Sequence, residues 1–488
     1  MGSIKKELAK GVAWTGLSAY TGQILGIIIT MILARLLSPT EFGLIALATV
    51  VSSFLGMLST MGIGPAIIQR KDLTQDNLNS IFTFTLIVGL TLGIILFCSS
   101  WPIAAFYEDE RLIPITQIMA VLLFLGPANM VPEALMNKNK RFKENAERSI
   151  LLQVISGAIA IYAAWNGAGV YSLLIAPFFT SVGTFIWNRR FYKVYIDWHL
   201  NIEPIKRIFS FSFYQLLFDT VNYFSRNLDK LIIGKYLSMD DLGLYEKSYR
   251  MMQMPLHQIT FVITPVLHPL LKDFQNDLNE IHNKITKLIR FLATISFPVG
   301  ITLSCCSEEI ITFMYGNKWE AAIPIFQVLA LSVPLQLVFS STGVVYLVCN
   351  NTKLQFWIGI RNTITTIAGF IIALYFWGTT ISVAWSFVIT MHINFFISHY
   401  VMYKYALKKE WYDIYKNLAK PLCILLVLAL YFYAINLFIS DYNIIIRGTI
   451  KIAGAGIISA LMIQSMGLID LSSKFKQIMN KINNRHAK

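Results

Sequence analysis

The sequence predicts an all-α integral membrane protein with about fourteen transmembrane helices. Hydrophobic residues make up 55% of the 488 residues and charged residues only 14%, whereas soluble proteins have roughly 45–50% and about 25%. Apolar runs of about 20 residues, the length that crosses a bilayer, recur along the chain. They cover 12–37, 42–68, 78–102, 112–136, 148–165, 167–188, 208–234, 242–271, 288–306, 321–349, 354–377, 379–403, 418–439 and 444–467.

The connections between these runs indicate their orientation, because Lys and Arg gather in cytoplasmic loops. With the N-terminus inside, thirty of the 41 Lys and Arg residues fall in inner connections. Outer connections hold five, namely Arg35, Arg111, Lys235, Lys318 and Arg447. We therefore expect both termini in the cytoplasm. This bias accounts for most of the net charge of +14, so no nucleic-acid partner is needed to explain it.

A unit of six runs occurs twice. Residues 33–44 (LARLLSPTEFGL) match residues 233–244 (IGKYLSMDDLGL) at an offset of 200. Two further matches follow: PITQIMA from Pro114 with PIFQVLA from Pro324, at an offset of 210, and Asn137 with Asn350. Because six is an even number, both halves enter from the same side. Such parallel repeats are related by a pseudo-two-fold axis along the membrane normal, with the substrate site expected between them.

The repeat predicts three parts of the chain. An N-terminal lobe of six helices and a basic cytoplasmic linker cover 1–206, a second six-helix lobe covers 207–410, and two added helices with a basic tail cover 411–488. The longest connection, about 189–207, is either a basic amphipathic segment on the inner leaflet or a simple basic linker.

Charged residues interrupt the seventh run, where residues 222–237 read NYFSRNLDKLIIGKYL. One helical face would carry Asp219, Asn222, Arg226, Asp229 and Lys230. A charged side chain at the bilayer centre costs roughly 2.5–3.5 kcal/mol, and a Leu or Ile returns only about 0.3–0.6 kcal/mol. This face is therefore expected to find partners or water rather than lipid.

The eighth run supplies matching charges. Glu246 and Arg250 share a face, with Lys247 beside them. Arg226 and Arg250 each lie nine residues from the outer hairpin at 235–241, about 13 Å along a helix. The four cations of the two runs outnumber Asp229 and Glu246 by two, which favours binding of an anion, and the arginine fork suits a diphosphate. The alternative is an ion network that only joins the two helices.

Other ionisable residues are weaker candidates. Arg361 lies about 10 Å inside the eleventh run from the cytoplasmic side, where it would either extend to lipid phosphate or line an inner vestibule. Asp219, Asp229 and Glu246 are candidates for coupling to H⁺ or Na⁺, although a structural, hydrogen-bonded Asp219 is equally consistent with its position. We expect Lys451 to extend towards the outer surface. Seven His and five Cys give no zinc spacing, and no nucleotide-binding motif occurs, so no cofactor is expected.

Two long blocks carry a resemblance to a known family. Residues 32–74, beginning ILARLLSPTEFGL, and residues 223–260, beginning YFSRNLDKLIIGKYL, resemble polysaccharide exporters of the Wzx type. These belong to the MOP superfamily, which also contains MATE drug exporters and lipid II flippases, and the resemblance is closest to the branch that exports colanic and teichuronic acid units. It extends over about the first 400 residues, and the last two runs contain no such block.

The resemblance implies a flippase that moves an undecaprenyl-diphosphate-linked oligosaccharide from the inner to the outer leaflet of the bacterial cytoplasmic membrane by alternating access. Its product would feed O-antigen, capsule or exopolysaccharide assembly. Besides that lipid-linked oligosaccharide, membrane lipids and the polysaccharide polymerase machinery would be its partners. By this analogy Arg226, Lys230 and Arg250 would meet the diphosphate or acidic sugars, with Lys247 and Arg361 as further cations of the path.

Three alternatives are less consistent with the residues. A MATE-like exporter of organic cations should offer an excess of carboxylates, whereas cations exceed them here. A membrane-embedded polysaccharide polymerase or ligase, the enzyme alternative, should have a large outer loop, and every outer connection is short. A major-facilitator transporter shares the six-plus-six plan but leaves the last two runs and the two blocks unexplained.

Overall fold

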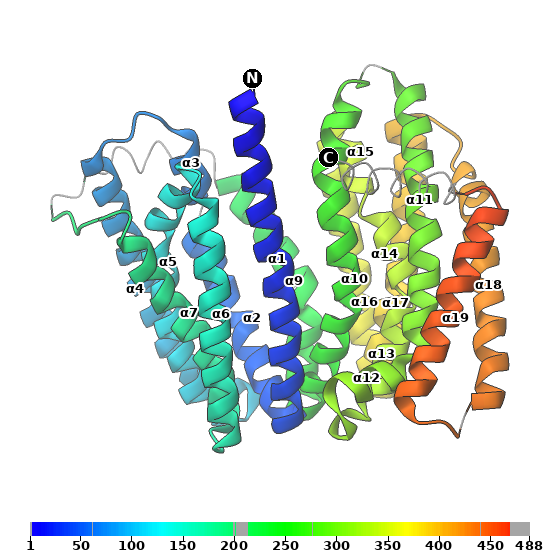
Figure 1. Cartoon of the computed structure of the whole chain (residues 1–488), viewed down its shortest axis with the longest axis horizontal. Coiled ribbons are helices and arrows are strands. Elements are labelled where there is room, and N and C mark those ends of the chain that lie inside the picture. Colours follow the sequence, from blue (N-terminus) through cyan, green and yellow to red (C-terminus); the bar gives the residue numbers. More distant parts are fainter. Residues whose placement is uncertain are drawn as a thin grey trace, which may run out of the picture. The chain divides into compact units, whose positions relative to one another are not determined.

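The regular elements of the described chain are all helices (Figure 1). The computed structural model describes residues 2–60, 62–198, 201, 213–275, 277–439 and 441–468. By its internal contacts the chain divides into two units, Met1–Gly243 and Leu244–Lys488. Each unit is described by itself.

The first unit is a bundle of long helices. Within it α1 packs along α6, α4 along α5, and α9 against α2. Its elements are α1 (Gly2–Leu36), α2 (Pro39–Thr60), α3 (Ile63–Gln69), α4 (Gln75–Tyr107), α5 (Leu112–Lys138), α6 (Phe142–Trp165), the short η1 (Gly169–Tyr171), α7 (Ser172–Arg189) and α9 (Phe213–Tyr236).

The second unit begins within α10 (Met239–Lys272). Here α11 packs against α18 and α14, and α16 packs against α17. The other elements are α11 (Leu278–Cys305), α12 (Ser307–Tyr315), η2 (Asn317–Trp319), α13 (Ala322–Ala330), α14 (Val333–Phe339), α15 (Thr342–Val348), α16 (Thr352–Trp377), α17 (Thr380–Val401), η3 (Met402–Leu407), α18 (Asp413–Ile439) and α19 (Ile444–Ser465).

Most of the predicted membrane helices are confirmed. Eleven helices of the described residues are long and apolar enough to cross a membrane, and α13 with α14–α15, a pair bent by 43°, would make a twelfth. The charged helices α9 and α10 are not among them, because their polar faces lower their hydropathy below that of an ordinary span. The fourteen-helix arrangement in two lobes stays a prediction.

The repeat at an offset of 200 is visible in the helix ends. α1 ends and α2 begins at Leu36 and Pro39, and α9 ends and α10 begins 200 residues later. In the first connection the hydroxyl of Ser38 donates to Glu41 at 2.9 Å, and in the second the hydroxyl of Ser238 donates to Asp241 at 2.6 Å. A serine before a helix and an acid three residues later form the same kind of cap in both places.

Two repeat-related glycines let these helix starts cross at backbone distance. A Cβ atom on Gly43 would lie 1.8 Å from the carbonyl oxygen of Met239, and one on Gly243 would lie 1.9 Å from that of Pro39. No side chain fits at either position. Beside the crossing, the hydroxyl of Thr40 donates to the carboxylate of Asp240 at 3.0 Å.

The second repeat match also has a structural basis. In the first unit a Cβ on Gly93 of α4 would lie 3.1 Å from the carbonyl oxygen of Ala120 on α5. In the second unit a Cβ on Gly300 of α11 would lie 3.3 Å from the carbonyl oxygen of Ala330 on α13. Ala120 and Ala330 are the last residues of the matched segments PITQIMA and PIFQVLA. The match therefore marks the same close helix crossing in each unit.

The third repeat match, which paired Asn137 with Asn350, is wrong by three residues. The residue with left-handed backbone in the α5–α6 turn is Lys140 (φ 55°), and in the α15–α16 turn it is Asn350 (φ 53°). Because the turns have the same conformation, the structural equivalent of Asn350 is Lys140 rather than Asn137. The offset between the two units therefore remains 210 from the α5 segment to this turn.

The described part of the 189–207 connection lies along the start of α4. The backbone N–H of Tyr195 donates to Asn79 at 3.0 Å, and that of Asp197 donates to the hydroxyl of Thr83 at 2.7 Å. The side chain of Ile196, between them, is 51% exposed, and that of Trp198, after them, is 87% exposed. Residues 199–200 and 202–212 lie outside the described residues, so the structure tests neither interpretation of the whole segment.

Candidate functional site

In the first unit the predicted site residues lie on α9. Arg226 is exposed, Lys230 is half-buried and Asp229 is 3% exposed. The carboxylate of Asp229 accepts a hydrogen bond from the backbone N–H of Lys230 at 2.8 Å, and both residues make further contacts. Asp219 belongs to α9, but its side chain lies outside the described residues. The guanidinium group of Arg226 is therefore at the surface of α9, whereas the carboxylate of Asp229 is enclosed.

Helix α9 is fixed to α2 by two neighbouring aromatic residues. The hydroxyl of Tyr223 donates to the carbonyl of Val50 at 2.5 Å. The ring of Phe54 on α2 lies 4.9 Å from that of Phe224, centre to centre. These contacts determine which face of α9 carries Arg226 to the surface.

The C-terminal end of α9 is held by Lys235. Its ammonium group donates to the carbonyl of Phe106 at 2.6 Å and to the carboxylate of Glu108 at 2.8 Å. The hydrogen bond and the charge of Lys235 hold the pKa of Glu108 below its usual value. In this way this end of α9 is joined to the end of α4.

In the second unit the predicted residues lie on α10. The guanidinium Nε of Arg250 donates to Glu246 at 2.5 Å, and the Arg250 side chain is 62% exposed whereas that of Glu246 is 5% exposed. Lys247 is buried, with its ammonium group 5.9 Å from the centre of the Tyr315 ring on α12. The structure thus brings Arg250 and Glu246 together and directs Lys247 into the packing of its own unit.

Arg361 lies in a polar network between α16 and α17. Its Nη1 donates to the side-chain oxygen of Asn394 at 3.2 Å. Asn394 in turn donates to the carbonyl of Asn362 at 3.2 Å and to the hydroxyl of Thr366 at 3.1 Å. The Nε and Nη2 atoms of Arg361 are buried and have no hydrogen-bond partner among the described residues. The side chain therefore points to α17, and two of its nitrogen atoms are enclosed without a hydrogen-bond partner among the described residues.

A buried ion cluster in the second unit was not predicted. Lys451 on α19 does not extend outward. Its ammonium group lies 2.5 Å from Glu309 on α12, and both side chains are at most 5% exposed. Arg447 contacts Glu309 at 2.6 Å and Glu308 at 2.7 Å. The sequence could have indicated this cluster, because all of its charges lie near the predicted outer ends of their helices and therefore at a similar depth in the membrane.

A second unpredicted cluster lies near the inner end of the first unit. Arg148 of α6 is buried and donates to Asn188 of α7 at 2.5 Å. It also pairs with Glu133 of α5 at 3.2 Å. Arg148 is the first residue of the predicted run 148–165, and its nearly equal distance with Glu133 from the α5–α6 turn is the signal that could have paired the two.

The described residues offer no obvious place for a metal. No group of three His, Cys, Asp or Glu side chains among them has the arrangement that holds a metal ion. All five cysteines are free thiols.

Comparison with known proteins identifies the family. The model of a family described as polysaccharide biosynthesis protein matches residues 32–324, more than half of the chain. The teichuronic acid biosynthesis protein TuaB of Bacillus subtilis (strain 168) is 26% identical over 440 residues, 90% of each protein. The lipopolysaccharide biosynthesis protein WzxC of Escherichia coli (strain K12) is 22% identical over 439 residues, 89% of each protein.

Solved structures give the same fold. A structure of the lipid II flippase MurJ, in an inward closed conformation, matches with a TM-score of 0.68 at 16% identity, covering 93% of this chain and 99% of that one. An inward-facing MATE transporter of the MOP superfamily matches with a TM-score of 0.56 at 13% identity, covering 79% and 95%. These structures share the all-helical fold, and the family match shows that the chain belongs to the polysaccharide biosynthesis protein family.

Proposed function

We propose that this protein is a flippase that moves undecaprenyl-diphosphate-linked oligosaccharide repeat units from the inner to the outer leaflet of the bacterial cytoplasmic membrane. The units would serve assembly of a surface polysaccharide, with the polysaccharide polymerase as the next recipient. The arrangement of fourteen membrane helices, the cytoplasmic termini and alternating access between two lobes belong to this proposal. Its support is the family, the fold and the charges on α9 and α10.

One observation carries the proposal: each unit presents an exposed arginine well inside a helix, while the nearest carboxylate is buried. Arg226 on α9 and Arg250 on α10 both lie about 13 Å from the outer hairpin along their helices. A guanidinium at that depth is too costly to leave in lipid. We infer that both line a water-filled translocation path, where bidentate donors suit a diphosphate.

The burial of the carboxylates argues against export of organic cations. Asp229 and Glu246 are 3% and 4% exposed, so neither offers an accessible negative charge to a drug. They remain candidates, with Asp219, for coupling to H⁺ or Na⁺. A polymerase or ligase is also less consistent with the chain, since the outer connection from α1 to α2 and that from α9 to α10 are each only two residues long.

The proposal is tested by removing each arginine. In a strain that lacks its own flippase for the same glycan, R226A and R250A should each lower surface polysaccharide by about tenfold or more, since a hydrogen bond to a charged group contributes roughly 1.5–3 kcal/mol. The control is R111A, because Arg111 is exposed outside the helices and pairs only with its neighbour Asp109 at 2.7 Å. It should leave export unchanged.

Protein level distinguishes the two roles of the charges. If R226A and R250A reach the membrane in normal amounts but do not export, the residues serve the substrate. If both proteins disappear from the membrane, the charges join the helices and the proposed site is wrong. Normal export by both variants would also reject it.

A further inference from the structure

A chain of aromatic rings with lysines beside it lies where α17 and η3 lead into α18, at an end that the sequence predicts to face the cytoplasm. The ring of Phe396 stacks on that of Tyr415, with 5.9 Å between their centres. Tyr415 lies 5.5 Å from Trp411, and Trp411 lies 5.9 Å from Tyr400. We call this surface the α17–α18 patch, and its residues are Phe396, Tyr400, Lys404, Lys408, Trp411 and Tyr415.

The backbone of η3 determines which residues of this connection reach the surface. η3 is a π-helical turn, and the residues that it buries in the core of the second unit are Met402, Tyr403, Ala406 and Leu407. Lys408 then has a left-handed backbone (φ 54°), and the N–H of Lys409 donates to the carbonyl of Tyr403 at 2.9 Å. The turn closes in this way with Lys404 and Lys408 both exposed.

Lys404 and Lys408 keep their positive charges. The ammonium group of Lys404 donates to the hydroxyl of Tyr400 at 2.8 Å and lies 5.6 Å from the centre of the Tyr405 ring, and both of these neighbours are neutral. An ammonium group has three N–H donors, so two of them remain for a ligand. Neither lysine forms an ion pair with a carboxylate in the part of the chain that the structure describes.

The carboxylates of the connection do not cancel this charge. Asp413 is shared between His282 and Lys416, at 3.6 Å from each. Glu410 is exposed. Residues 400–416 contain four lysines and only these two carboxylates, so cations are in excess by two. The α17–α18 patch therefore favours an anionic partner.

The position of the rings favours a phospholipid as that partner. α17 with η3, and α18, are each long and apolar enough to cross a membrane. Beyond the patch, Ile393 and Ile397 of α17 and Leu422 of α18 are exposed, so the rings continue into an apolar surface. Tyr and Trp gather where a bilayer meets water, and lysines just outside a membrane helix attract anionic lipids. An acidic cytoplasmic protein would use the lysines but not this apolar continuation.

We propose that the α17–α18 patch binds the headgroup of an anionic phospholipid of the phosphatidylglycerol type. Lys404 and Lys408 would contact the phosphate, and the rings of Trp411 and Tyr415 would lie against the glycerol and the first carbons of the acyl chains. The inference goes beyond the proposed function, because it concerns a lipid of the surrounding membrane and not the cargo. The bound lipid would join η3 to the first of the last two helices.

The test measures binding of defined phospholipids to the full-length protein in detergent by native mass spectrometry. The first phosphatidylglycerol should bind about tenfold more tightly than phosphatidylcholine with the same acyl chains. K404Q/K408Q should lose this preference, since two basic residues leave a membrane surface. Glutamine at 404 can still donate to Tyr400. The single variants K404Q and K408Q should each show part of the loss, and they carry the test if the double variant does not fold.

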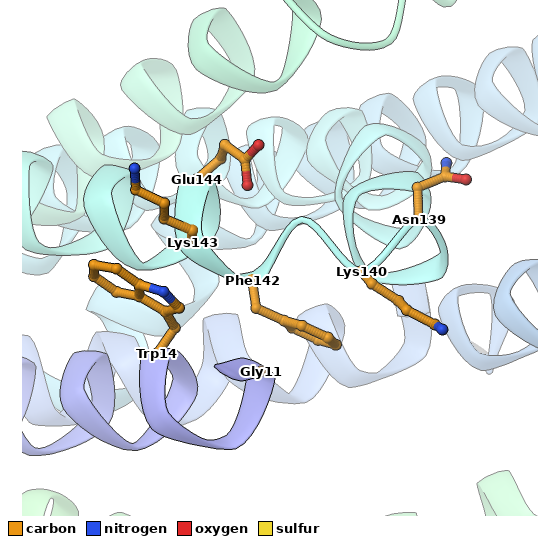
Figure 2. Close-up of a pocket in the computed structure, with 7 residues that line it drawn as sticks. All are labelled: Gly11, Trp14, Asn139, Lys140, Phe142, Lys143 and Glu144. Atoms are coloured by element: carbon orange, nitrogen blue, oxygen red, sulfur yellow. The ribbon is translucent and has the colours of Figure 1, made fainter. Parts of the chain in front are cut away.

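The first unit offers a matched control. In the groove between the start of α1 and the α5–α6 turn, which Figure 2 shows, the ammonium group of Lys143 lies 5.9 Å from the centre of the Trp14 ring. Lys143 is also paired with Glu147 at 3.5 Å. K143Q therefore removes a lysine that lies beside a ring but already has a carboxylate partner, and it should leave the preference for phosphatidylglycerol unchanged.

A second control measures the general attraction of a basic surface. Lys71 and Lys353 are exposed at other predicted cytoplasmic turns. K71Q/K353Q removes the same charge as K404Q/K408Q and should leave the preference unchanged. Equal losses in these two double variants would overturn the inference, and so would a preference that survives in K404Q/K408Q or is absent from the unaltered protein. Because no transport is measured, the result is independent of R226A and R250A.

Discussion

Arg361 and Glu309 show two ways in which this protein keeps a charge among its helices. Arg361 has one neutral partner, Asn394, and two buried nitrogen atoms without a partner among the described residues. Glu309 contacts two cations, Lys451 and Arg447. Leaving a charge buried and uncompensated costs several kcal/mol. Arg361 is therefore suited to receive an anion, whereas Glu309 is suited to hold helices together.

The first prediction concerns Glu309. E309Q should lower the free energy of unfolding by about 3–5 kcal/mol, because it leaves Lys451 buried without a countercharge. The matched control is E308Q: Glu308 binds the same Arg447 but is 53% exposed, so its loss should cost at most about 1 kcal/mol. Thermal unfolding of both variants in detergent measures the difference. Equal melting temperatures would show that the buried pair contributes no stability.

At the residue scale, the sequence predicts how far along a membrane helix a charged residue lies better than it predicts which residue that charge contacts. It predicts that charges on the seventh and eighth runs avoid lipid, and the structure shows Asp229 and Glu246 buried but Arg226 and Arg250 exposed. It did not predict that Lys451 meets Glu309, 142 residues away. A contact of that kind depends on which helices pack together, and hydropathy carries no information about packing partners.

At the scale of elements, the first turns of α2 and α10 cross at backbone distance. Gly43 and Gly243 each face a backbone carbonyl, and each turn is capped by a serine and an acid. Because the two turns are so alike, each glycine makes the same kind of contact with the backbone of the other turn. A change at either glycine should therefore have the same effect.

The second prediction concerns this crossing. G43A and G243A should each reduce stability or yield, because the new methyl group would lie within 2 Å of a backbone oxygen. Since backbone atoms move less easily than side chains, the helix starts would have to separate. The control is G126A in α5, where a Cβ meets no atom within 4 Å. Alanine there should be neutral or stabilising by up to about 1 kcal/mol.

The amount of protein in the membrane and its melting temperature are the measurements for these glycine variants. A normal melting temperature for G43A would mean that the first turns of α2 and α10 do not need to touch. A loss in G126A equal to that in G43A would mean that glycine itself, rather than the crossing, is required.

The ends of the helices were largely predictable from the sequence, but breaks inside a predicted run were less so. Apolar runs end where polar turn residues begin, so the predicted ends of most runs lie within a few residues of the helix ends. The run at 321–349 is instead divided into α13, α14 and α15, with a bend of 43° between α13 and the pair that follows it. The breaks fall at Leu331–Ser332, just before Pro334, and at Ser340–Ser341, and the mean hydropathy of the whole run does not reveal such short polar steps.

At the scale of the whole molecule, the distribution of positive charge predicts the orientation in the membrane. Inner connections hold thirty of the 41 basic residues. The third prediction follows from this asymmetry. In a variant without cysteines, a new cysteine at Glu110, an exposed residue in the turn after α4, should react with a membrane-impermeant maleimide in intact cells.

A cysteine at Lys71 is the matched site for this labelling. Lys71 is exposed in the turn before α4, at the opposite end of the same helix. It should react only after the membrane is made permeable. Reaction of the cysteine at position 71 but not of that at position 110 in intact cells would reverse the predicted orientation.

The buried pair of Lys451 and Glu309 also limits how this chain can be shortened. The last two helices carry no recognisable block, and they look like an appendage that could be cut away. Deleting them would remove Arg447 and Lys451, the two cations that pair with Glu309, and would leave its carboxylate without a countercharge next to acyl chains. A viable truncation after residue 411 would therefore need a second change at Glu309, and any homologue that lacks the two helices is expected to have an uncharged residue there.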